Sequence, residues 1–231
     1  MNHSQKTMNT VSLLKHISAH HTPAVFANSF GAEDVVLIDL ISRHAPGIGI
    51  FSLDTGRLPQ ETYALMQTIR QRYPETEFRI FFPAAAEIED YVQKNGPDAF
   101  YNSIELRKQC CHIRKVEPLN RALAGKKAWV TGLRRDQSTT RQNLLDTEWD
   151  ELHGLQKFNP LANWTEKEIW DFIQEQDLPY NSLHDKGYPS IGCAPCTRAI
   201  TRGEDIRAGR WWWENPDSKE CGLHPATPLS A

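Results

Sequence analysis

The residues best suited to chemistry in this 231-residue chain are its five cysteines. They occur as an adjacent pair, a Cys-x-x-Cys and a single residue: Cys110, Cys111, Cys193, Cys196 and Cys221. An odd number cannot all pair, and this clustering is typical of a metal site plus a spare thiol. The Cys-x-x-Cys spacing lets two sulfurs share one metal. The adjacent pair is rarer, because neighbours on a helix point about 100° apart. Its two sulfurs reach one centre only with local distortion or at a large cluster.

The four clustered cysteines leave three interpretations open. A four-iron cube is larger than a single Zn²⁺ and accommodates the adjacent pair more easily. A Cys₄ zinc site is the second interpretation. The third is a redox Cys-x-x-Cys beside a buried, inert pair.

Cys221 stands apart from the other cysteines, with Lys219, Gly222 and His224 nearby. Such neighbours favour a thiolate and an accessible sulfur. The alternative is a stray thiol in a tail. A buried structural cysteine does not suit the segment 216–231, which is polar and rich in proline.

Strands and helices alternate along residues 23–131 and must position these groups. Apolar runs predict strands, and helical spacing predicts the helices between them. The strands are expected at 23–28, 47–53, 77–82 and 127–131. The helices are expected at 35–44, 60–72, 84–94 and 103–123, the last interrupted by Pro118, and a capping box opens another at 165–175. Residues 158–161 read as extended, and the chain beyond 179 as mostly loop.

Short connections of this kind give parallel strands with right-handed crossovers. The sequence therefore predicts an α/β fold with a doubly wound, mainly parallel sheet and an irregular C-terminal extension. The chain divides into a polar N-terminal segment at 1–22, a main domain at 23–210 that carries the four clustered cysteines, and a C-terminal tail at 211–231 that carries Cys221.

Three polar turns follow strand ends, at 29–34, 54–57 and 132–141. Ligands of such sheets bind beyond the carboxyl ends of the strands, so the turns should converge on one cleft. The first presents Ser and Gly at a helix N-terminus, which suits an anion, although an ordinary connection looks alike. The second holds Asp54, either a ligand to a ribose or an adenine or a helix cap. The third holds Arg134, Arg135 and Arg141, whose forks suit phosphate and sulfate unless the loop is merely a solvated basic face.

Composition excludes several classes of protein. The net charge is −3, which does not suit a general polyanion binder, so we expect no nucleic-acid partner. No apolar run approaches the roughly 20 residues of a membrane span, and the N-terminus lacks the apolar region of a signal peptide. A cytoplasmic protein with reduced thiols is the expectation.

Taken together, these motifs resemble the cluster-containing branch of the APS/PAPS sulfonucleotide reductase family, the assimilatory adenosine 5′-phosphosulfate (APS) reductases of bacteria. The match runs in the family's order and spans nearly the whole chain after residue 24. It is carried by the segments 29–34, 53–56, 110–111 with Lys115, 134–138, 192–196, 207–211 and 220–224.

The resemblance implies a fold akin to the adenine nucleotide hydrolases and ATP pyrophosphatases. It implies one [4Fe–4S] cluster per subunit on the four paired cysteines, and Cys221 as the catalytic nucleophile. The electron donor would be thioredoxin or a glutaredoxin-like protein. A homo-oligomer is compatible with the sequence. Together with the turns, the resemblance predicts these substrate-binding residues: Ser29, Gly31, Asp34, Leu53, Asp54, Thr55, Gly56, Lys115, Arg134, Arg135, Arg207, Arg210 and His224.

The predicted reaction is thioredoxin-dependent reduction of APS to sulfite and AMP through an S-sulfocysteine, in sulfate assimilation and cysteine biosynthesis. One alternative is reduction of 3′-phosphoadenosine 5′-phosphosulfate (PAPS), alone or beside APS; relatives specialised for PAPS generally lack the paired cysteines. A zinc-stabilised nucleotide-binding module would have no need of Cys221. An ATP pyrophosphatase-type transferase fits poorly, because its usual Ser-Gly-Gly-rich loop is replaced here by Ser29-Phe30-Gly31-Ala32.

Overall fold

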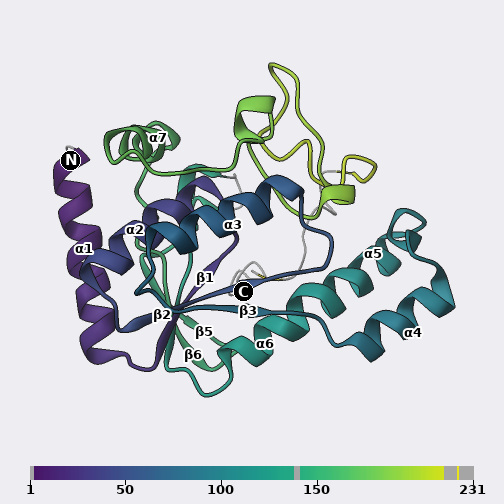
Figure 1. The fold of residues 1–231 in the computed structure, drawn as a ribbon, viewed down its shortest axis with the longest axis horizontal. Helices are drawn as coiled ribbons and strands as arrows, with labels where there is room; N and C mark the ends of the chain where they lie inside the picture. Colours follow the sequence, from purple (N-terminus) through teal and green to yellow (C-terminus); the bar gives the residue numbers. More distant parts are fainter. Residues whose placement is uncertain (1–2, 138–140, 216–222, 224–231) are drawn as a thin grey trace.

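The structure is a computed structural model that describes residues 3–137, 141–215 and 223. A six-stranded sheet runs in the order β3-β2-β1-β4-β6-β5 (Figure 1). All neighbouring strands are parallel except β5, which pairs antiparallel with β6. The strands are β1 (Ala24–Asn28), β2 (Ile48–Leu53), β3 (Phe78–Phe81), β4 (Ala128–Val130), β5 (Thr147–Asp150) and β6 (Leu155–Phe158). The prediction of a mainly parallel α/β sheet is confirmed.

The longer helices mostly follow the predicted segments. They are α1 (His3–His20), α2 (Ala32–His44), α3 (Gln60–Arg72), α4 (Ala85–Asn95), α5 (Ile104–Cys111), α6 (Glu117–Leu123) and α7 (Glu166–Glu175). Short helical turns are η1 (Ala99–Tyr101), η3 (Arg135–Gln137), η5 (His184–Lys186) and η6 (Ala194–Cys196). The capping box at the start of α7 is present as predicted, with Thr165 accepting from the Glu168 backbone N–H.

The sheet separates two apolar layers because successive side chains of a strand point to opposite faces. Phe26, Ile50 and Val130 face the main core, which helices α1, α2 and α7 cover. Val25 and Trp129 face the other side and pack against Leu119 of α6. Both faces are thus buried, as a parallel sheet requires.

Three features differ from the sequence prediction. The first helix after β1 begins at residue 32, so residues 32–34 belong to it and not to the preceding turn. The predicted helix 103–123 is divided by a π-helical turn, η2 (His112–Val116), and Pro118 sits in the first turn of α6, where a missing N–H costs little. The hairpin β5–β6 was not predicted beyond an extended segment at its end.

Residues 3–20 form a docked helix rather than only a polar segment. Leu14 and Ile17 of α1 are fully buried in the main core. The Thr10 hydroxyl donates to the Pro160 carbonyl oxygen and accepts from the Trp164 indole N–H. Lys6 forms an ion pair with Glu168 of α7 at 2.8 Å. Among the described residues, no helix is both long and apolar enough to cross a membrane.

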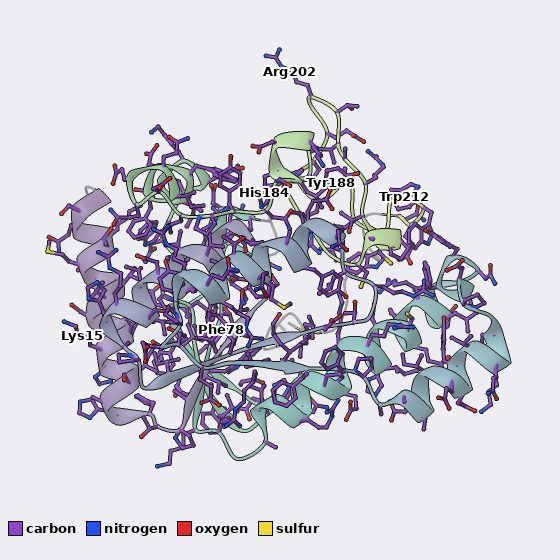
Figure 2. All side chains as sticks on the ribbon, viewed as in Figure 1. Lys15, Phe78, His184, Tyr188, Arg202 and Trp212 are labelled. Carbon is purple, nitrogen blue, oxygen red and sulfur yellow. The ribbon has the colours of Figure 1, made fainter. Side chains whose placement is uncertain are left out.

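Truncating the buried face of α1 should destabilise the whole domain. We expect Leu14→Ala to lower the free energy of unfolding by about 2–5 kcal/mol, through lost apolar burial and a cavity. Lys15, which points away from the molecule in Figure 2, is the matched control. Lys15→Ala should change the free energy by less than about 0.5 kcal/mol. Denaturant unfolding measures both values; equal effects would show that α1 does not belong to the core.

Candidate active site

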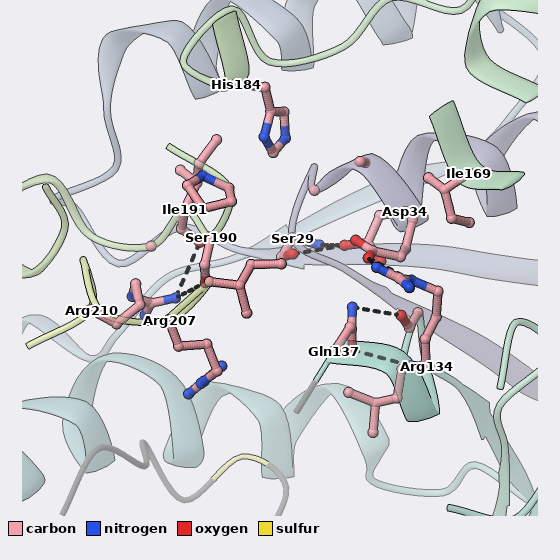
Figure 3. A pocket seen from close by; sticks show the side chains of 18 of the residues that line it. Ser29, Asp34, Arg134, Gln137, Ile169, His184, Ser190, Ile191, Arg207 and Arg210 are labelled. Carbon is pink, nitrogen blue, oxygen red and sulfur yellow. Dashed lines mark hydrogen bonds and ion pairs between the residues drawn. The ribbon is translucent and has the colours of Figure 1, made fainter. Parts of the chain in front are cut away.

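The turns that follow β1, β2 and β4 open onto one cleft of about 790 Å³. Ser29 and Gly31 line it from the first turn, Thr55 from the second and Arg134 from the third (Figure 3). Parallel strands bring their carboxyl ends to one edge of the sheet, which is why residues about a hundred positions apart meet here. The prediction that the three turns converge is confirmed.

The first turn is closed by a buried carboxylate. Both the backbone N–H and the hydroxyl of Ser29 donate to Asp34, at 2.5 and 2.7 Å. Burial raises the pKa of Asp34 to about 7, although the hydrogen bonds from Ser29 oppose the rise. Gly132 packs against this carboxylate so closely that a Cβ there would lie 2.3 Å from Asp34 Oδ1. The turns after β1 and β4 therefore touch through a position that only glycine can occupy without a shift.

The second turn presents its threonine, and not its aspartate, to the cleft. Asp54 Oδ1 accepts from the Gly56 backbone N–H and from the Tyr63 hydroxyl, both at 2.8 Å. Leu53 and Thr55 line the cleft, whereas Asp54 and Gly56 do not. Asp54 thus braces its own turn; it is not the helix cap that the sequence left as the alternative, because Pro59 is the N-cap of α3 and no side chain caps that helix.

The two adjacent arginines of the third turn, Arg134 and Arg135, lie in different surroundings. Arg134 is buried, lines the cleft and pairs with Glu33 at 2.7 Å. Arg135 lies outside the cleft, where it pairs with Asp146 at 3.1 Å and bonds to the Asn163 side chain. The geometry therefore supports a ligand-facing role for Arg134 and gives Arg135 a place in bracing the loop.

Further cations reach the cleft from segments that follow the sheet. Lys115 comes from the π-helical turn η2, and Arg207 and Arg210 come from the C-terminal loop (Figure 3). Arg210 passes close over Gly192, where a Cβ would lie 2.3 Å from its terminal nitrogen. Leu223 also lines the cleft and packs against the apolar layer around Trp129. Cys221 and His224, predicted as nucleophile and substrate-binding residue, lie outside the described residues.

The four clustered cysteines converge on one small buried cavity of about 20 Å³. All four are free thiols and all are buried. Cys110 and Cys111 end helix α5, and the π-helical turn follows at once. π-Helical turns are often found at functional sites, and this one provides the local distortion that an adjacent pair requires. Cys193 is the N-cap of the helical turn η6, and Cys196 is its last residue.

Cations and aromatic rings surround the cysteine cavity. Its other lining residues are Phe100, Arg107, Arg114, Lys115, Arg210 and Trp211. Cys193 Sγ donates to Thr55 Oγ1 at 3.3 Å, and the Thr55 carbonyl oxygen accepts from Arg114 at 2.6 Å. Burial raises the pKa of Cys110, and it raises that of Cys196 to about 12. Thr55, Lys115 and Arg210 therefore belong to the cleft and to the surroundings of the cysteines at once.

Two buried N–H groups test whether these residues fit a metal–sulfur group. Arg114 Nε and Trp211 Nε1 line the same site and have no hydrogen-bond partner among the described residues. Buried donors without partners are uncommon, and cluster or thiolate sulfurs would accept from both. No three His, Cys, Asp or Glu side chains in the described part are arranged around a single metal ion. The four buried thiols and the two buried donors beside them thus fit a metal–sulfur group.

Several site residues were not predicted from the sequence. Glu33 and His184 line the cleft, and Arg107 and Arg114 line the cysteine cavity. The sequence contained a signal for the two arginines. Arg107 lies four residues before Cys111 and Arg114 four residues after Cys110, a spacing that places each on the same side of a helix as a cysteine. Glu33 and His184 had none, because their place depends on long-range packing.

Known proteins place this site in a family. The family model described as the phosphoadenosine phosphosulfate reductase domain matches residues 23–199. The adenosine 5′-phosphosulfate reductase of Allochromatium vinosum is 56% identical over 93% of this chain and 83% of its own length. That of Burkholderia cepacia is 55% identical over 95% of this chain and 88% of its length. That of Neisseria meningitidis (serogroup A) is 49% identical over 96% of this chain and 91% of its own length.

Solved structures agree with these sequence matches. A PAPS reductase from Candida auris, solved as a phosphate complex, superposes with a TM-score of 0.71 at 28% identity, covering 83% of this chain and 90% of that one. Yeast FAD synthetase superposes with a TM-score of 0.56 at 16% identity, covering 85% of this chain and 67% of that one. At this identity the likeness shows the fold alone. The nucleotide-binding fold class expected from the sequence is therefore confirmed. From the matched domain and these relatives, the chain belongs to the APS/PAPS reductase family.

Proposed function

We propose that this protein reduces adenosine 5′-phosphosulfate to sulfite and AMP. Relatives that carry this name are 49 to 56% identical over most of the chain. The observation that carries the proposal is the wall shared by the two sites. Lys115 and Arg210 line both the cleft and the cysteine cavity. A nucleotide anion in the cleft would therefore lie beside the cysteine site.

The cationic side chains of the cleft suit a phosphosulfate. Lys115 comes from the π-helical turn η2, whereas Arg207 and Arg210 come from one turn of the C-terminal loop, and all three approach one space. Arginine forks bind phosphate and sulfate oxygens, and a lysine adds a point charge. Arg134 is already paired with Glu33, so it supports the wall more than it adds net charge. Ser29 and Gly31 also line the cleft, at the N-terminal end of α2, where the helix offers backbone N–H groups to an anion; both donors of Ser29 itself are used by Asp34.

We assign a [4Fe–4S] cluster, one per subunit, to Cys110, Cys111, Cys193 and Cys196. Support comes from four free, buried thiols on one cavity and from the two buried N–H donors beside them. When bound, such a cluster would orient the surrounding groups, among them Lys115 and Arg210, which face the substrate. The two-electron chemistry proposed below needs no electron relay.

Cys221 is the proposed nucleophile. Its thiolate attacks the sulfur of APS in line, forming an S–S bond to the sulfonate and breaking the sulfur–oxygen bond to AMP, which leaves with that electron pair. Lys115, Arg207 and Arg210 hold the phosphosulfate and offset the charge that builds on the leaving group. Support comes from Leu223, two residues further along the chain, which lines the cleft.

A dithiol donor, thioredoxin or a glutaredoxin-like protein, would complete the reaction. One thiolate attacks the Cys221 sulfur and expels sulfite, which leaves a mixed disulfide. The second thiol of the donor resolves that disulfide, releasing the Cys221 thiolate and oxidised donor. This chemistry requires reduced thiols, so we place the protein in the cytoplasm, as an enzyme of sulfate assimilation. APS is favoured over PAPS because the similar curated relatives are APS reductases.

A sulfite-release assay with reduced thioredoxin tests the function directly. The anaerobically purified protein should release sulfite from APS, and should do so faster than from PAPS. Equal rates would identify a dual-specificity enzyme. If the protein releases sulfite from neither APS nor PAPS, the proposed function is wrong.

The cluster assignment predicts that iron and colour are lost together. Cys193→Ser or Cys196→Ser should lose iron and visible absorbance, because a hydroxyl is a poor replacement for a thiolate ligand of iron. Cys221→Ser is the matched control and should keep both. Stoichiometric zinc without iron in the anaerobically purified native protein would make the assignment wrong.

Cys221→Ser should abolish sulfite release while APS binding persists. A serine hydroxyl stays protonated at neutral pH and is far less nucleophilic than a thiolate. Native protein given APS without reductant should release AMP once and gain one sulfonate on the peptide that contains Cys221. Intact-mass and peptide-mass spectrometry measure the adduct. An adduct on another cysteine, or normal turnover of Cys221→Ser, would contradict the proposed mechanism.

The buried Asp34 predicts a pH dependence of stability. Its pKa is raised to about 7, whereas an unfolded aspartate titrates near 3.9. Between these values the folded state binds the extra proton, so Asp34 destabilises the fold increasingly as pH rises from 4 to 7. Asp34→Asn keeps the shape and cannot ionise. Its stability relative to native should grow over that range by up to about 1.4 kcal/mol per pH unit. A difference that is constant with pH would contradict the shifted pKa.

A further inference from the structure

A buried ion pair joins the C-terminal segment to the cysteine-bearing helix. Arg107 of α5 and Glu214 form two parallel hydrogen bonds, Nε to Oε1 at 2.8 Å and a terminal nitrogen to Oε2 at 2.7 Å. The side chain of Arg107 is 0% exposed and that of Glu214 is 3% exposed. Arginine stays protonated in proteins, so both hydrogen bonds to the carboxylate join opposite charges. The pair is thus ionised and shielded from water.

The segment that Glu214 fixes contains a backbone conformation that side chains rarely adopt. Trp211 has a φ of +41° although it is large and only 1% exposed. Its N–H donates to the Cys196 carbonyl oxygen at 3.1 Å, and its own carbonyl oxygen accepts from the Glu214 N–H at 2.9 Å. Such strain persists only where surrounding contacts over-determine it, and it is found mainly at functional sites.

The strained turn controls where Arg210 points. The guanidinium carbons of Arg107 and Arg210 lie 4.9 and 4.8 Å from the Trp211 ring. Arg210 forms a backbone bridge with Thr197, directly after the Cys-x-x-Cys, and it lines both the cleft and the cysteine cavity.

We propose that Arg107 and Glu214 are positioning residues: their ion pair locks the Trp211 turn and so fixes Arg210 in the cleft. The inference rests on the proposed function only where it predicts a change in the rate of AMP release from APS. A bidentate fork defines distance and angle, whereas an apolar contact between the same segments could slide. Water cannot compete for a pair that is fully buried.

The experiment compares three variants of the full-length, anaerobically purified protein. Glu214→Gln keeps the size of the side chain and one acceptor but removes the charge. Arg107→Lys keeps the charge but loses the fork and its stacking on Trp211. Asp98→Asn breaks the exposed Arg57–Asp98 pair nearby, whose carboxylate is 66% exposed, and is the matched control. Each is measured by hydrogen exchange, by iron content and by the rate of single-turnover AMP release from APS.

Glu214→Gln should speed amide exchange in residues 208–215 by about tenfold or more, because the turn opens locally. Exchange in β1 and β2 and the iron content should stay as in the native protein. AMP release should slow by about tenfold, since a small misplacement of a positioning group has such effects. Arg107→Lys should be intermediate, and Asp98→Asn should match the native protein.

Several results would overturn the proposal. Native-like exchange at 208–215, or AMP release within about twofold of native in Glu214→Gln, would show that the pair positions nothing. Faster exchange throughout the sheet, or failure of Glu214→Gln to fold while Arg107→Lys behaves as native, would make the pair a support of the fold alone. If the native protein itself releases no AMP, the proposed function fails, and the exchange result still decides whether the turn is locked.

Discussion

Burial of positive charge at the carboxyl end of the sheet is the constraint on which the site depends. Among the described residues, the buried arginines are Arg107, Arg114, Arg134 and Arg210, and all of them line the cleft or the cysteine cavity. A buried guanidinium must be paired or hydrogen-bonded, because leaving one unsatisfied costs several kcal/mol. Each therefore ties its own segment to another one.

The partners of these arginines come from distant parts of the chain. Arg134 pairs with Glu33 across the ends of β1 and β4. Arg114 donates to the Thr55 carbonyl oxygen after β2, and Arg107 pairs with Glu214 near the C-terminus. The site is thus held by charge-assisted contacts between its own walls, and the cations that remain toward the cleft are kept in place before any anion arrives. Preorganised charge of this kind needs no rearrangement when a substrate binds.

How much of this could be predicted from the sequence varied with the range of the interactions. The strands at 24–28 and 48–53 and the polar turns after them have strong local signals, so the sheet and the convergence of its turns were predictable. Helix α1 was missed because its buried face is only Thr10, Leu14 and Ile17 within a polar sequence. Strand β5, with the sequence TEWD, is a short, charged edge strand with little apolar alternation. Arg134 and Arg135 are adjacent and alike in sequence; only the direction of each side chain, set by Glu33 and Asp146, separates them.

The shared wall has a thermodynamic consequence. Because Lys115 and Arg210 face both the cleft and the cysteine cavity, a change of charge on one side alters the field on the other. Filling the cysteine cavity with a group that accepts from Arg114 and Trp211 would order the same segments that present Lys115 and Arg210 to an anion. Linkage is reciprocal, so an anion in the cleft must stabilise the occupied cysteine site by the same free energy. The cysteines therefore need not touch the substrate to influence how it is held. The π-helical turn directly follows Cys111, and the Trp211 N–H donates to the Cys196 carbonyl oxygen, so these two turns connect the two sites.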